Sequence, residues 1–155
     1  MKHLPWKYSA GLVDGEGCVR VGFRIKKNGD NSIHIFPQIG LELTLTESCK
    51  HVVDLLENNY GGRTYLREYD NPNWKPTWTW RLYDKSKCRA IFQNIHQYCL
   101  IKGNQMLLAM WCYDNLRGEV SREVMDTLKS EFKALKADPH RLSERATQKI
   151  SELMR

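Results

Sequence analysis

The stretch Tyr8-Ser9-Ala10-Gly11-Leu12-Val13-Asp14-Gly15-Glu16-Gly17 decides how the rest of the chain is interpreted. From Trp6 to Val13, aromatic, small and aliphatic residues follow one another with no charge after Lys7, which predicts a short buried helix. Gly15 and Gly17 should end the helix, because a residue without a Cβ leaves it easily through a positive φ. Ala10 and Gly11 add little bulk, and Gly11 and Gly15 share one side. We therefore expect a second helix to pack closely there.

The same stretch places two carboxylates, Asp14 and Glu16, at the predicted helix exit. The helix macrodipole is negative at that end and disfavours acids, and a divalent cation would compensate for this. A buried helix that ends in an acidic glycine turn is the alternative, but it leaves the second acid without a role. For Asp14 we favour a structural role, in which its side chain hydrogen-bonds backbone groups at the helix end.

Ser9–Gly17 reads S-A-G-L-V-D-G-E-G and resembles the nine-residue motif of the LAGLIDADG homing endonucleases. It departs from the motif at Ser9 and carries conservative exchanges at Val13, Gly15 and Glu16. The chain has one such motif, so it resembles the homodimeric branch of that family. The resemblance implies an intron-encoded, site-specific double-strand DNA endonuclease. Such an enzyme cuts a long pseudo-palindromic target by Mg²⁺-dependent phosphodiester hydrolysis and leaves short 3′ overhangs.

The resemblance also implies a site and an interface. Ala10, Gly11 and Gly15 would form the dimer interface around a twofold axis. Glu16 of each chain, helped by the Gly15 carbonyl, would hold Mg²⁺, with Mn²⁺ or Ca²⁺ as substitutes in binding. Two glutamates so close would raise each other's proton affinity unless cations lie between them.

Two further catalytic residues follow from the resemblance alone. Lys102 matches the place of a basic residue near the scissile phosphate, although an isolated loop lysine is equally typical of an ordinary surface charge. Glu47 occupies the place where the family often has a glutamine that organises water. An acid there also suits the first turn of a helix, so both interpretations of Glu47 stand.

Hydrophobic periodicity outside the motif predicts the fold class. Cys18–Lys26 and Ile33–Thr46 alternate apolar and polar residues around a turn at Asn28-Gly29-Asp30-Asn31, which indicates a long hairpin, with Leu45 among the inward residues. Two more strands are expected at Arg63–Tyr69 and Thr77–Tyr83, and helices are expected after the caps Ser48, Asp84, Ser121 and Ser143. We predict an α+β fold of order αββαββα, a single domain over residues 1–155 with a C-terminal helical extension from about residue 119 to 155. Its antiparallel four-stranded sheet, a saddle in the family, would carry helices on one face.

The other face of that sheet is predicted to be polar and basic. A two-stranded β-ribbon fits the DNA major groove, where outward side chains reach base edges. A solvated sheet face is the alternative, and the motif shifts the balance toward DNA. The predicted DNA-binding residues on the strands are Arg20, Arg24, Lys26, Gln38, Thr44, Arg67, Thr79 and Arg81, and those in the tail are Arg141, Ser143 and Arg145.

Composition agrees with a nucleic-acid partner. The chain has 155 residues, a net charge of +6 and a pI of about 9.1, which favour a polyanionic partner. Its five cysteines form no CxxC pair, so we expect free thiols in a reducing compartment. No leader-like or membrane-spanning apolar run is evident, which predicts a soluble, intracellular protein of the cytoplasm or an organelle matrix.

Two other functions remain open from the sequence. An RNA maturase, whose partner would be intron RNA, shares the fold and can keep the acids. A non-catalytic DNA-binding regulator would also share the fold, and the presence of Glu16 and Lys102 counts against it.

Overall fold

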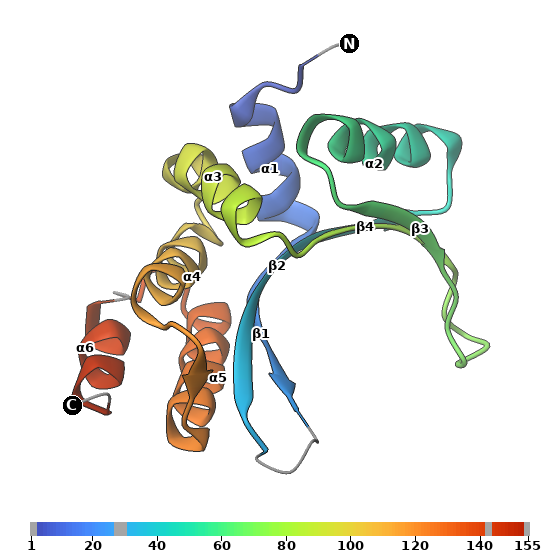
Figure 1. Ribbon diagram of the computed structural model, residues 1–155. Coiled ribbons are helices and arrows are strands. Elements are labelled where there is room, and N and C mark those ends of the chain that lie inside the picture. The colour runs from blue at the N-terminus through green and yellow to red at the C-terminus, as the bar shows by residue number, and fades with distance from the viewer. Residues whose placement is uncertain (1–2, 27–30, 142–143, 154–155) are drawn as a thin grey trace.

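The protein is described by a computed structural model over residues 3–26, 31–141 and 144–153 (Figure 1). The order of elements confirms the predicted α+β fold, and η1 and β5 are additions that no sequence pattern indicated. In chain order the elements are α1 (Trp6–Glu16), β1 (Gly17–Ile25), β2 (Ile33–Thr44), α2 (Glu47–Tyr60), β3 (Arg63–Arg67), β4 (Thr77–Leu82), α3 (Lys85–Ile95), η1 (His96–Tyr98), α4 (Gly103–Asn115), β5 (Glu119–Val120), α5 (Arg122–Ala137) and α6 (Glu144–Leu153).

The strands form one antiparallel sheet in the order β1-β2-β4-β3, and the short β5 pairs with β2. Figure 1 shows that this sheet is strongly curved, with α1, α2 and α3 over its convex side. The helices α4, α5 and α6 lie beside the β1–β2 hairpin. No helix covers the concave side, so the fold presents one curved sheet surface to solvent.

The core lies between the convex side of the sheet and the helices. Ile39 and Leu41 of β2 and Trp80 of β4 are at most 1% exposed, as their alternation predicts. The expectation fails at Leu45, which is 49% exposed because β2 already ends at Thr44. Ile25, at the far end of β1, is 42% exposed. Alternation therefore identifies the inward face only where helices lie above it.

The end of α1 differs from the sequence expectation. Neither Gly15 nor Gly17 has a positive φ, and Gly17 has an extended conformation with φ −81° and ψ 165°. The chain thus passes directly from α1 into β1. Glycine is needed at position 17 for a different reason: a Cβ there would lie 2.5 Å from the Val13 carbonyl oxygen. Glu16 is consequently held where the helix layer meets the sheet.

Side-chain caps fix where several helices begin. Asp84 accepts a hydrogen bond from the Lys87 amide (2.8 Å), and Ser121 accepts one from the Val124 amide (3.1 Å), as predicted. The prediction for α2 is wrong, since Thr46 and not Ser48 caps it by accepting from the Cys49 amide (3.1 Å). The predicted cap Ser143, and most of the turn predicted at residues 28–31, lie outside the described residues.

The five cysteine thiols are all free, in agreement with the sequence expectation. Burial raises the pKa of Cys88 and Cys112 to about 12, so both stay protonated at neutral pH. Across residues 3–26, 31–141 and 144–153, no helix has both the length and the apolar character needed to span a membrane.

Candidate active site and nucleic-acid interface

The Asp14 carboxylate ties the last turn of α1 to the segment that leads into α4. It accepts hydrogen bonds from the backbone amides of Leu100 (2.8 Å), Ile101 (2.9 Å) and Lys102 (2.7 Å). The predicted structural role of Asp14 is therefore correct in kind. The amides belong, however, to a segment distant in the chain and not to the end of its own helix.

Lys102 lies beside the motif, as the sequence hypothesis requires. Its backbone amide binds the Asp14 carboxylate, and its ammonium group donates a hydrogen bond to the Asp14 carbonyl oxygen. Lys102 directly precedes α4. The end of α1 thus carries a cation next to its two acids, in a place where the partial negative charge of the helix terminus favours one.

Replacing Asp14 with Ala should destabilise the protein. Three backbone donors would lose their acceptor, and an unsatisfied buried donor typically costs about 1–3 kcal/mol. Since the loop is partly exposed and water can replace some of these bonds, we expect a loss of about 2 kcal/mol in the free energy of unfolding. Urea unfolding of the variant measures this, with Asp70→Ala as a control at an exposed turn position. Equal midpoints for the two variants would contradict the tethering role.

Glu16, by contrast, is uncommitted. It is the last residue of α1, its side chain is exposed, and no hydrogen bond or salt bridge to it occurs among the described residues. Glu47 is exposed as the first residue of α2, directly after the Thr46 cap, so its helix-starting role has a structural basis. Within the described ranges, no three His, Cys, Asp or Glu side chains gather where they could hold one metal ion.

One side of α1 is open. A Cβ added at Gly11 or Gly15 would meet no atom within 4 Å. Tyr8, one helical turn before Gly11, is 47% exposed on the same side. Ala10 is fully buried in the chain's own core, so its expected place in an interface between two chains is wrong. The small-residue face available to a partner consists of Gly11 and Gly15.

The predicted DNA-binding residues divide into exposed and covered ones. Arg20, Arg24, Lys26, Thr44 and Arg67 are exposed on the strands or just after them. Three others, although on the concave face, are buried: Gln38 (2% exposed), Thr79 (0%) and Arg81 (8%). These three are corrections to the sequence expectation, since none of them offers its side chain to a ligand in this conformation.

The covering has identifiable causes. Gln38 accepts a hydrogen bond from Arg20 Nε at 2.6 Å, so Arg20 lies over it. Arg81 extends across its strand partner Gly40, where any Cβ would collide with the guanidinium group. Long side chains thus lie along the curved sheet and hide the shorter ones beneath them.

Glu42 organises the centre of the concave face. It forms salt bridges with Arg81 and Arg67, the latter at 2.5 Å, and accepts a hydrogen bond from the Tyr69 hydroxyl at 3.1 Å. Burial alone would raise the pKa of Glu42, but Arg81, Tyr69 and Arg67 together lower it below its usual value. Glu42 therefore stays ionised at neutral pH and offsets part of the positive charge predicted for this face.

In the tail, the structure separates the three predicted phosphate contacts. Arg145 is exposed near the start of α6. Arg141 is committed to Glu131 of α5 at 3.1 Å, and its backbone carbonyl accepts a hydrogen bond from Asn104. Ser143 lies outside the described residues. Of the described pair, only Arg145 is free of an acidic partner.

Sequence reasoning missed a row of lysines on α5. Lys129, Lys133 and Lys136 recur at helical spacing, and all three are exposed. That spacing was visible in the sequence. Nothing in the sequence indicated that this side of α5 lies against β1.

Similarity to solved structures accounts for almost the whole chain. The homing endonuclease I-CvuI, solved with the I-CreI target DNA, superposes with a TM-score of 0.62 at 13% identity over 97% of this chain and 94% of its own. The homing endonuclease I-TnaI has a TM-score of 0.56 at 14% identity, covering 99% of this chain and 100% of its own. The LAGLIDADG homing endonuclease I-LtrWI, bound to target DNA, has a TM-score of 0.51 at 17% identity over 81% of this chain and 38% of its own.

This chain has the LAGLIDADG homing-endonuclease fold. No protein-family model and no curated protein matches by sequence. The LAGLIDADG fold is therefore recognised here from its shape and from the motif in α1. One copy of it corresponds to nearly all of I-CvuI and to less than half of I-LtrWI.

Proposed function

We propose that the protein is a site-specific double-strand DNA endonuclease of the homing type that acts as a homodimer. One observation carries the proposal: the exposed, unpaired Glu16 lies at the end of an open-faced helix in a chain that superposes end to end on a homing endonuclease crystallised with DNA. An acid with no partner at such a position is unfavourable in the free chain and favourable once a cation binds.

The homodimer is supported by the open side of α1. Gly11 and Gly15 allow the backbones of two helices to approach closely, and a twofold axis would pair this side of α1 with itself. One chain contributes a single unpaired motif acid, and two chains would bring two together. Two adjacent Glu16 carboxylates repel each other unless a cation lies between them.

The residues present fit a divalent metal ion. The Glu16 carboxylate and the carbonyl groups at the end of α1 are oxygen donors, which Mg²⁺ prefers, with Ca²⁺ as a hard substitute. I-CvuI was crystallised with DNA in the presence of Mg²⁺ and, separately, of Ca²⁺. When bound, Mg²⁺ activates water and stabilises the leaving oxygen in phosphodiester hydrolysis.

The chain's own residues perform the remaining steps. Glu16 would hold the ion and orient the attacking water. Lys102, held at the end of α1 by Asp14, would place a positive charge beside the scissile phosphate. Because two chains would act on two strands around one axis, the cuts would be symmetric. We propose that they leave short 3′ overhangs in an intron-associated, pseudo-palindromic target.

Recognition would use the concave face. The β1–β2 hairpin fits the major groove, and the exposed Arg20, Arg24 and Lys26 project from its first strand and the residue after it. Arginine binds guanine in a bidentate manner at the base edge. Arg67 and Arg81 are held by Glu42, so base contacts by them require Glu42 to release them.

A selection from a randomised DNA library tests the function. The protein is incubated with the library and Mg²⁺, and the cleaved molecules are sequenced. We expect long near-palindromic sites with short 3′ extensions, and no product when EDTA replaces Mg²⁺. A Glu16→Gln preparation run in parallel removes any contaminating nuclease from consideration. Absence of cleavage with Mg²⁺, or cleavage without sequence preference, would refute the proposal.

A further inference from the structure

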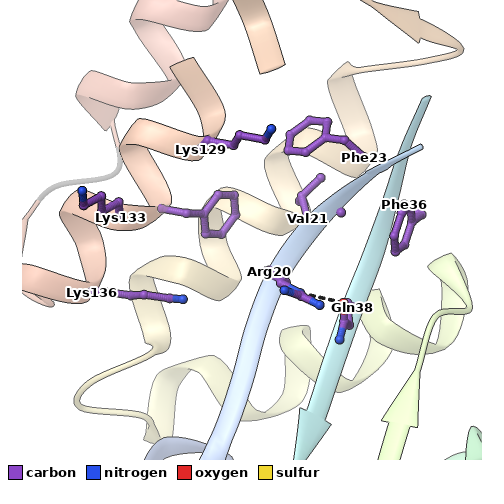
Figure 2. A pocket seen from close by; sticks show the side chains of 10 residues that line it. Arg20, Val21, Phe23, Phe36, Gln38, Lys129, Lys133 and Lys136 are labelled. Atoms are coloured by element: carbon purple, nitrogen blue, oxygen red, sulfur yellow. Dashed lines mark hydrogen bonds between the residues drawn. The ribbon is translucent and has the colours of Figure 1, made fainter. Parts of the chain in front are cut away.

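A basic groove runs between α5 and the outer edge of the sheet. Lys129, Lys133 and Lys136 of α5 line a cavity of about 450 Å³ together with Arg20 of β1 and Gln38 of β2. Figure 2 shows Lys129 and Lys136 extending from α5 toward the strands, with Arg20 and Gln38 opposite them. The groove is partly apolar, because Phe23, Phe36 and Phe132 also line it.

The charge of this groove is not compensated. Four cationic side chains line it and no acid does. Glu131, an acid of the same helix, is 5% exposed and bound to Arg141. In the part of the chain that the structure describes, none of the three lysines forms a salt bridge. The Lys129 ammonium group instead lies 5.5 Å from the centroid of the Phe23 ring.

We propose that this groove binds the phosphate backbone of the duplex DNA that lies against the concave face. The inference rests on the proposed function and adds a second contact surface to it. Lysines on flexible stems bind phosphate as point charges, without the fixed geometry that base recognition needs. The groove therefore contributes affinity that is independent of sequence.

The width of the sheet places the groove at the edge of the DNA major groove. The four main strands are separated by three spacings of about 4.8 Å, so the sheet is about 14 Å wide, close to the roughly 12 Å of the major groove. β1 is an edge strand, which puts it beside one of the two phosphate ridges. Arg20 projects from β1 into this cavity, so it links the concave face to the groove.

The test compares two double variants with the same change in net charge. Lys129→Gln with Lys136→Gln removes two cations from the groove. Lys85→Gln with Lys87→Gln removes two exposed cations at the start of α3, on the convex side (Figure 1). The equilibrium dissociation constant for duplex DNA is measured by fluorescence anisotropy in Ca²⁺ over a series of KCl concentrations. Thermal unfolding of each variant establishes that it is folded.

The groove variant should lower the magnitude of the slope of log K against log[KCl] by about 2, because each phosphate contact contributes about 0.9. Two lost contacts weaken binding on the order of 50-fold near 0.1 M salt, and equally for target and unrelated duplexes. The α3 variant should keep the slope of the unsubstituted protein. Lys129→Arg with Lys136→Arg should keep it too, since charge and not base geometry is required.

Equal slopes for the groove and α3 variants would overturn the inference while leaving the proposed endonuclease intact. A slope that changes only on structured RNA would also overturn it and would assign the groove to RNA. If the unsubstituted protein bound no duplex DNA at all, the proposed function itself would fail, which is a separate result from equal slopes.

Discussion

Replacing Glu16 with Gln should abolish DNA cleavage while leaving DNA binding in place. The carboxylate is the only motif acid without a partner among the described residues, since Asp14 is committed to three backbone amides. Gln keeps the size and polarity of the side chain but removes the negative charge that a divalent ion needs. We expect the single-turnover cleavage rate to fall by roughly 1,000-fold or more. The dissociation constant in Ca²⁺-free buffer should change little.

Glu123→Gln is the matched control. Glu123 is an exposed acid in the first turn of α5, and its replacement makes the same chemical change away from α1. Its cleavage rate should stay within a few-fold of the unsubstituted rate. If Glu16→Gln cleaved as fast as this control, the catalytic role given to Glu16 would be wrong.

Replacing Gly11 with Leu should separate dimer formation from folding. In the isolated chain the position is open, so the side chain meets nothing, and Leu is favoured over Gly in a helix by roughly 0.8–1 kcal/mol. In a dimer, both copies would carry the added bulk into the seam. Overpacking costs about 1–3 kcal/mol per site, so two sites raise the dimer dissociation constant by roughly 30-fold to 10,000-fold. Size-exclusion chromatography and cleavage assays should report monomers with little activity.

Gly17→Ala provides the contrasting result on the same segment. A Cβ at position 17 would lie 2.7 Å from Val13 Cα, so the backbone must shift. We expect a loss of about 1–3 kcal/mol in the free energy of unfolding. A Gly11→Leu protein that stayed dimeric and active would show that this face of α1 is not the interface. An unaltered free energy of unfolding for Gly17→Ala would contradict the close approach described here.

Local chemistry made much of the fold predictable. Period-two alternation identified Ile39 and Leu41 as inward, and Asp84 and Ser121 each cap a helix at the expected residue. The cap of α2 was missed because Thr46 and Ser48 are both good caps. The choice between them depends on where β2 stops pairing with β4, which is at Thr44. That is a tertiary fact with no local signal.

The candidate site was predictable in part for the same reason. The motif located Glu16, and the structure places Lys102 beside Asp14 at the end of the motif helix. Alternation also put Gln38, Thr79 and Arg81 on the concave face, but it carries no information on exposure. Sheet curvature and long neighbouring side chains bury all three. The groove beside β1 depends on how α5 packs, which periodicity within α5 does not specify.

The pairing of two chains through α1 can be measured most directly by sedimentation equilibrium. The account predicts a particle of twice the 18.2 kDa chain mass that dissociates when Gly11 is replaced by Leu. It also predicts two chains on each duplex target in Ca²⁺. A mass of one chain at every concentration, with a single chain bound per target, would contradict a shared site built from two Glu16 residues.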